Sequence, residues 1–144
     1  MYFPDLSACF KETWSSMYAV GWLDLAHPYP QSEVPGEVIE RLAAFCAEPP
    51  VCTMGFHECE FCDTSQGAIP ARLNEKSHWL GSCMIFVFGP DGRAYNAPDL
   101  IYHYVTEHRY QPPQAFITAL MQCPMPDTPE YQALVKAVRI GRAA

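Results

Sequence analysis

The sequence is poor in charged residues, and most of those present are acidic. Charged side chains make up 17% of the 144 residues, with 9 basic against 16 acidic side chains and a net charge of −7. Few charges together with 49% hydrophobic residues exclude the disordered class and predict one folded domain over residues 1–144. The lack of a stripe rich in Lys and Arg argues against nucleic acid as a partner.

Long apolar runs are also missing. No run approaches the roughly 20 residues that a membrane-spanning helix needs, so we expect no membrane contact. Residues 1–5 read Met-Tyr-Phe-Pro-Asp and lack the basic start and apolar stretch of a secretory signal peptide. We therefore expect a cytoplasmic protein.

The acidic charge is concentrated in one half of the chain. Residues 1–70 carry two basic and ten acidic side chains, whereas residues 71–144 carry seven basic and six acidic ones. An acidic region suits a basic protein partner, and it also simply keeps a protein in solution. Both interpretations stay open at this stage.

Cysteine, by contrast, is abundant. The seven cysteines are Cys9, Cys46, Cys52, Cys59, Cys62, Cys83 and Cys123. An odd count without an export signal argues against a disulfide framework and makes metal binding the first alternative for closely spaced cysteines. Cys46 and Cys123 are predicted to be small core residues, whereas the roles of Cys9 and Cys52 stay open.

Hydrophobic periodicity predicts an α+β fold. Strand-like runs cover residues 18–23, 84–88 and 93–96, and the last two form a hairpin around the turn at 89–92. Residues 64–80 are polar and are predicted to be an irregular surface excursion.

Four helices complete the predicted fold. The first begins near Pro35 and ends before Pro49, and the second runs from Pro98 to His108. A third begins after Pro112-Pro113, with Phe116, Ile117, Leu120 and Met121 pointing inward. The last runs from about Thr128 to Ile140, with Leu134, Val135 and Val138 buried.

The strongest chemical signal is Cys59-x-x-Cys62, the spacing of a zinc knuckle, in which two thiolates turn toward one ion. A hairpin and a helix with His103 and His108 follow it. Knuckle, hairpin and helix in this order resemble a treble-clef arrangement, in which the helix supplies the second pair of ligands. We predict a zinc site at these four residues, and iron is the alternative ion in the cell.

The fourth ligand is uncertain because a five-residue step on an α-helix rotates by about 140°. His108 therefore reaches an ion bound by His103 only if the helix ends or distorts near Thr106. His57, two residues before Cys59, is the competing ligand and needs no distortion. Each histidine also has a simpler role, because His103 could pack in the core and His108 could interact with the helix C-terminus.

Catalytic signals are weaker than the metal signal. The sequence has no glycine-rich phosphate loop and no Gly-x-Ser-x-Gly elbow. Cys83 could act as a nucleophile with His78 or His57 as its base, although an apolar strand residue is the simpler interpretation. Glu58, Glu60 and Glu107 could serve a hydrolytic zinc as a base, and solvated glutamates are the simpler interpretation. Catalytic residues therefore stay unknown, and we lean toward a protein that is not an enzyme.

The combined motifs resemble a family of small bacterial proteins with a domain of unknown function. They include Gly-Trp-Leu-Asp at 21–24, the His-x-Cys-x-x-Cys of 57–62, and the Ala-Pro-x-Leu-Ile-x-His-Tyr that begins at Ala97 and is followed by His108. The resemblance covers about residues 1–122, and a C-terminal helix of about 123–144 lies outside it. It implies no activity, but it supports the same cysteine and histidine positions.

Three functional hypotheses follow. The first is a zinc-stabilised α+β domain that binds another protein, with a basic protein as the partner that its charge suits. The second is a metal-dependent hydrolase, in which Cys59, Cys62 and His103 hold zinc and water takes the fourth position. The third is a ββα-type nuclease, which the acidic charge disfavours.

Overall fold

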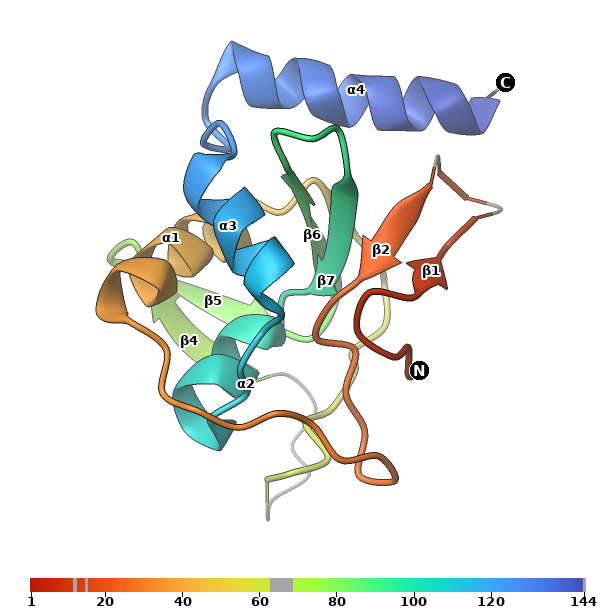
Figure 1. Ribbon diagram of the computed structural model, residues 1–144. Helices are drawn as coiled ribbons and strands as arrows, with labels where there is room; N and C mark the ends of the chain where they lie inside the picture. Colours follow the sequence, from red (N-terminus) through yellow and green to blue (C-terminus); the bar gives the residue numbers. More distant parts are fainter. Residues whose placement is uncertain (12, 15, 63–68, 144) are drawn as a thin grey trace.

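The structure is a computed structural model, and it describes residues 1–11, 13–14, 16–62 and 69–143 (Figure 1). The helices are α1 (Gly36–Ala47), α2 (Ile101–His108), α3 (Gln114–Gln122) and α4 (Pro129–Ala143). The strands are β1 (Ala8–Cys9), β2 (Met17–Ala19), β3 (Val51–Cys52), β4 (Ile69–Leu73), β5 (Lys76–Leu80), β6 (Cys83–Phe88) and β7 (Ala94–Pro98). Sheets and helices occur together, which confirms the predicted α+β class.

A five-stranded sheet in the order β1-β2-β7-β6-β3 forms the centre of the fold. Its middle is the predicted hairpin, in which β6 and β7 pair antiparallel with Phe86 opposite Asn96. The predicted strand at 18–23 is only partly formed, because β2 ends at Ala19. Gly21 follows at φ +78°, and its missing Cβ leaves room for the Ile101 side chain, whose atoms approach that position to 3.0 Å.

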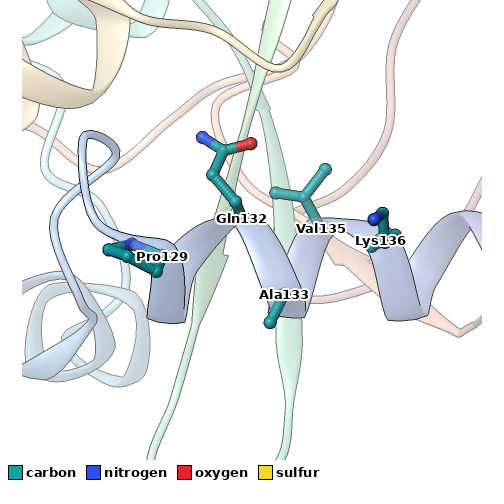
Figure 2. A pocket seen from close by; sticks show the side chains of 5 residues that line it. All are labelled: Pro129, Gln132, Ala133, Val135 and Lys136. Carbon is teal, nitrogen blue, oxygen red and sulfur yellow. The ribbon is translucent and has the colours of Figure 1, made fainter.

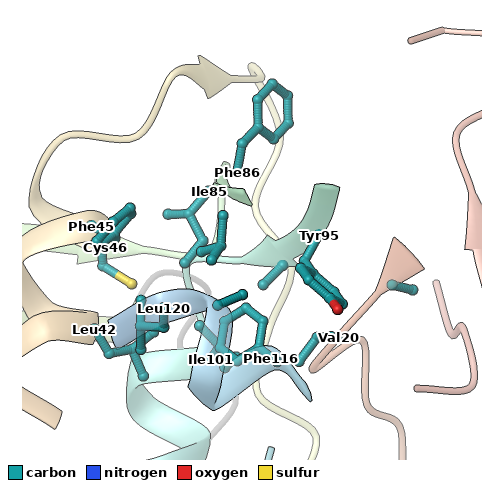
Figure 3. Close-up of a cluster of buried hydrophobic side chains, with 14 of the residues drawn as sticks. Val20, Leu42, Phe45, Cys46, Ile85, Phe86, Tyr95, Ile101, Phe116 and Leu120 are labelled. Atoms are coloured by element: carbon teal, nitrogen blue, oxygen red, sulfur yellow. The ribbon is translucent and has the colours of Figure 1, made fainter. Parts of the chain in front are cut away.

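Both faces of the sheet are covered. Side chains alternate along β6, so Ile85 lies on one face and Phe86 on the other. Figure 3 shows Ile85 directed toward Leu42 and Leu120 from the helices, whereas Phe86 points away from them. The Phe86 ring meets Trp14 with a centroid distance of 5.3 Å. The helices thus cover one face, and the aromatic N-terminal segment covers the other.

Helix α1 presents an apolar stripe to the core. Val38, Leu42, Phe45 and Cys46 are all buried, and α1 packs against both α2 and α3. Burial of each large side chain contributes about 1.5–3 kcal/mol, so the stripe is the main source of α1 stability. Cys46 and Cys123 are buried, as predicted for core residues.

Residues 69–80 form a β-hairpin, so the prediction of an irregular excursion over 64–80 was wrong there; residues 63–68 lie outside the described part of the chain. Strands β4 and β5 pair antiparallel around Asn74 and Glu75. These two residues have φ of 48° and 66°, as a two-residue type I′ turn requires. The signal was weak because the turn has no glycine and Pro70 interrupts the first strand.

Two inward-facing residues of the last helices were predicted incorrectly. Met121 and Leu134 are each 36% exposed, and Tyr131 is buried instead. The Tyr131 hydroxyl donates to the Phe86 carbonyl at 2.6 Å, which attaches α4 across the end of the hairpin. Thr128 caps α4 as predicted, because its Oγ1 accepts the Tyr131 amide at 3.2 Å.

A surface groove of about 500 Å³ runs along α4 and is drawn in Figure 2. The residues that line it are Pro129, Gln132, Ala133, Val135 and Lys136. Among the described residues, no helix is long and apolar enough to cross a lipid bilayer.

The structure contains a disulfide bond, so the prediction that the cysteines form no disulfides was wrong for one pair. Cys52 and Cys83 face each other across β3 and β6 and form a disulfide bond. The other five cysteines are free, which is why the total number of cysteines is odd. Cys83 is therefore neither a simple apolar strand residue nor a free nucleophile in this structure.

Candidate metal centre

Two segments that are more than 40 residues apart in sequence meet at one end of the sheet. The knuckle, defined as residues 59–62, lies against the side of α2 that carries His103 and His108. The ligand atoms of Cys59, Cys62, His103 and His108 all lie within 4.8 Å of one another. This group could hold a metal ion.

Four of the six distances between these atoms are close to those around a tetrahedral ion. The Nε2 atoms of His103 and His108 are 3.2 Å apart. The Cys62 sulfur lies 3.2 Å from His103 Nε2 and 3.6 Å from His108 Nε2, and the Cys59 sulfur lies 3.4 Å from His108 Nε2. Bonds of about 2.0–2.1 Å to nitrogen and about 2.3 Å to sulfur place tetrahedral ligands roughly 3.3–3.8 Å apart. The four side chains therefore suit zinc with little rearrangement.

Backbone amides of the knuckle donate hydrogen bonds to the Cys59 sulfur. Burial raises the pKa of the Cys59 thiol to about 11, while hydrogen bonds from the backbone amides of Phe61 and Cys62 oppose that rise. Without a cation this thiol is thus protonated at neutral pH. A bound cation stabilises the thiolate directly, so binding would release a proton.

Helix α2 brings its two histidines together through a widened last turn. The backbone amides of Arg109 and Tyr110 both donate to the Tyr104 carbonyl, five and six residues earlier. Such a π-type turn moves residues five apart closer to one face than an α-turn does. The helix ends at His108 rather than near Thr106, so the distortion that the five-residue spacing required lies at the final turn.

The electrostatic surroundings favour the neutral, ligand form of His103. Its side chain is buried, and burial lowers the pKa of its imidazole. The nearby His108 lowers that pKa further, and Glu107 opposes the change. A neutral imidazole with a free nitrogen is the form that coordinates metals.

Aromatic rings enclose the four candidate ligands on one side. Phe61 lies against His108 with a centroid distance of 5.5 Å and against Tyr104 at 5.8 Å. Tyr29 contacts Phe61 edge-on at 5.2 Å, and its hydroxyl donates to the His108 carbonyl at 3.0 Å. These rings limit water access and fix the end of α2. Phe56, five residues before Phe61, is 54% exposed and does not belong to this enclosure.

His57 lies outside the group of four. Its ring packs edge-on against Trp22 at a centroid distance of 6.2 Å, and its backbone amide donates to the Gly81 carbonyl at 2.7 Å. His57 thus holds the segment before the knuckle to the turn between β5 and β6. Among the histidines, the structure brings His103 and His108 to the cysteines.

Sequence reasoning missed two residues that position the centre. Asp99 Oδ1 accepts the Gly81 amide at 2.9 Å, which connects the β5–β6 turn to the start of α2. Gly81 has φ +126°, and a Cβ there would lie 2.7 Å from the His57 carbonyl oxygen. An aspartate near the start of a helix and a glycine before a strand are both common, so neither residue carries a sequence signal of these contacts.

The other catalytic candidates are not assembled into a site. Cys83 is joined to Cys52, and His78 lies on β5. The Glu60 carboxylate accepts the Leu25 amide at 3.1 Å, which gives it a structural contact. A cavity of about 20 Å³ between the knuckle and Trp22 has room for about one water molecule. A cleft of about 340 Å³ lies between β4 and α2, with His103 in its wall.

Comparison with known proteins identifies the family. The family described as Domain of unknown function (DUF7919) matches the chain over residues 1–121. The chain belongs to this family. No curated protein and no solved structure matches the chain. All four candidate ligands lie within the part that the DUF7919 model matches, whereas α4 lies outside it.

Proposed function

We propose that this protein is a zinc-binding domain in which Cys59, Cys62, His103 and His108 hold a structural ion. The observation that supports this proposal most is that four of the six distances between the ligand atoms are 3.2–3.6 Å, close to those of a tetrahedral site. Two sulfurs and two imidazole nitrogens form a donor set that suits zinc better than magnesium or calcium, which prefer oxygen.

The ion would connect two parts of the fold, of which only one consists mainly of helices and strands. The segment between β3 and the knuckle contains no helix, and α2 belongs to the main core. A structural zinc contributes its binding free energy to folding, of order 10 kcal/mol in isolated fingers. Knuckle, hairpin β6–β7 and helix α2 then form a treble-clef-like unit, with β4–β5 inserted between its first two parts.

The hydrolytic alternative has one supporting observation, the cleft beside His103. A catalytic zinc keeps one position for water or substrate. In the tetrahedron described above, His108 Nε2 takes that position, 3.2 Å from His103 Nε2. The closed set of four ligands therefore favours the structural role.

Within the same proposal, the domain binds another protein, and a basic one suits its charge. The N-terminal half is strongly acidic, and Met54 and Phe56 are exposed just before the knuckle. Exposed apolar side chains among acidic ones suit a partner with basic and apolar groups. Purification from the native host should recover a basic partner; a protein that is always recovered alone would contradict this part of the proposal.

Elemental analysis of the full chain tests the zinc site directly. We expect one zinc per chain, and we expect His103→Ala and His108→Ala each to lose it. The matched control is His57→Ala, because His57 lies next to the knuckle but outside the four ligands. Full zinc content in both His103→Ala and His108→Ala would overturn the proposed ligand set. Loss of zinc in His57→Ala alone would identify His57 as the missing ligand.

A further inference from the structure

The disulfide bond lies at an accessible edge of the molecule. Strand β3 is the outermost strand of the five-stranded sheet, and it is only two residues long. Cys52 on β3 is exposed, and Cys83 on β6 is partly buried. A thiol from solution can therefore approach the Cys52 sulfur more easily than the Cys83 sulfur.

The disulfide is the first of several contacts that hold the segment leading to the knuckle. The Thr53 amide and hydroxyl both donate to the Ser82 carbonyl, at 2.8 and 3.1 Å. The His57 amide donates to the Gly81 carbonyl at 2.7 Å. Residues 52–57 are thus attached to residues 81–83. The attached segment ends two residues before Cys59, the first candidate zinc ligand.

The same short turn also holds the other half of the metal centre. The Cys83 carbonyl accepts the Asp99 amide at 2.9 Å, and the Asp99 carboxylate accepts the Gly81 amide at 2.9 Å. Asp99 lies two residues before α2, which carries His103 and His108. Residues 81–83 therefore anchor both ligand pairs, and the disulfide is the covalent member of this anchor.

We propose that Cys52–Cys83 is a thiol-exchange site for a dithiol reductant, and that its reduction weakens retention of the metal ion. This inference rests on the proposed zinc site and adds regulation to it. The reason is mechanical. A two-residue strand holds poorly by itself, so the segment before Cys59 moves away more often when its covalent attachment is broken. Each such movement separates the Cys59 and Cys62 sulfurs from the histidines.

The exchange balances with one dithiol. A thiolate of the reductant attacks the Cys52 sulfur, the disulfide bond breaks, and Cys83 leaves as a thiolate that takes up a proton. The second thiol of the reductant then attacks the mixed disulfide and releases Cys52 as a thiol. Two electrons and two protons pass to the protein, and the reductant becomes a disulfide. The reverse sequence restores the bond.

The test measures zinc release from the zinc-loaded full chain into excess chromogenic chelator. Before the assay, thiol titration of the unfolded, metal-free chain should find five thiols, and seven after reduction. Dithiothreitol serves as the probe reductant because it is the kind of dithiol that the exchange requires, and it is removed by gel filtration before the chelator is added. We expect reduction to speed zinc release about tenfold, which corresponds to about 1.4 kcal/mol. Circular dichroism should show that the overall fold persists.

The matched control is the double variant Cys52→Ser with Cys83→Ser. Its zinc release should be as fast as that of the reduced protein and should not respond to dithiothreitol. Thr53→Val, which removes one hydroxyl contact and keeps the disulfide, should accelerate release less and should still respond.

Three results would overturn the inference while leaving the zinc site in place: seven free thiols before reduction, equal release rates in both redox states, or loss of the whole fold on reduction. Absence of stoichiometric zinc before the assay would instead overturn the proposed function, and the inference with it.

Discussion

The two ends of this molecule are held together in different ways. Around β6, β7, α1 and α3, many large side chains are fully buried against one another, among them Phe86, Phe116 and Leu120. Around the knuckle, Met54 and Phe56 are exposed, and a small number of hydrogen bonds, ring contacts and one disulfide bond hold the chain in place. The loss of one core contact is therefore partly compensated by many others, whereas the loss of one contact near the metal centre weakens the attachment of a whole segment.

Removal of a metal ligand should give the largest effect. Cys62→Ser should abolish zinc binding and lower the free energy of unfolding by about 5 kcal/mol or more, since structural zinc contributes of order 10 kcal/mol in isolated fingers. Thermal melts with and without a chelator provide the measurement. The variant should no longer respond to the chelator, and equal zinc content in variant and parent would contradict the prediction.

The control for that substitution is Cys46→Ser in the core. Cys46 is fully buried in α1, so the change should cost about 1–3 kcal/mol through burial of a hydroxyl group. Zinc should still bind at one ion per chain, and the chelator should still lower the melting temperature. Loss of zinc in this variant would mean that the two ends are not independent.

A large core deletion should give the next effect. Phe116 on α3 is completely buried, and its ring meets Tyr95 at a centroid distance of 6.0 Å. Phe116→Ala should lower the free energy of unfolding by about 3–5 kcal/mol, measured by urea denaturation. Zinc content should be unchanged in the folded protein, and a variant that folds but releases zinc would break the comparison between the two ends.

The pH dependence of the free energy of unfolding should reveal the titration of the Asp99 carboxyl. Burial raises its pKa to about 6 from 3.8, against the opposing hydrogen bonds from backbone amides. The folded state thus binds the proton more tightly, so this group's contribution to stability is full below pH 3.8 and is lost as pH rises to about 6. The loss is about 3 kcal/mol, taking 1.36 kcal/mol for each pH unit between the two values.

Asp99→Asn isolates that contribution, because the amide oxygen can still accept the Gly81 amide. The stability of the variant relative to the parent should increase between pH 4 and pH 6.5, as measured by denaturant titration. The metal ligands are identical in both chains, so their titration cancels in the difference. Parallel stability curves would show that the Asp99 carboxyl does not titrate in this range.

A pair of glycines gives the smallest and sharpest comparison. Gly81→Ala places a Cβ 2.7 Å from the His57 carbonyl oxygen, whereas Gly92→Ala at φ +86° meets open space. Both changes strain the backbone, at a cost of about 1–3 kcal/mol each. Only Gly81→Ala should also accelerate zinc release to a chelator. Equal release rates in the two variants would show that the β5–β6 turn does not affect metal retention.

The elements that could be predicted are those whose signals are local. The apolar stripe of α1, the turn between β6 and β7, and the Thr128 cap of α4 each depend on neighbouring residues. The hairpin at 69–80 was missed because its turn uses Asn74 and Glu75 at positive φ, a conformation that glycine usually signals. Leu134 and Met121 were placed inward because helical spacing alone does not say which of two adjacent faces is buried.

The sequence by itself determined the class of the fold and a short list of candidate metal-binding residues. Cysteine spacing and the histidines of α2 are local patterns, and their chemistry is carried by the residue types. Only the tertiary structure brought His108 rather than His57 next to the cysteines, paired Cys52 with Cys83, and placed Gly81 against His57. Each of these depends on where segments far apart in sequence come to lie, which is decided by packing across the sheet rather than by any local pattern.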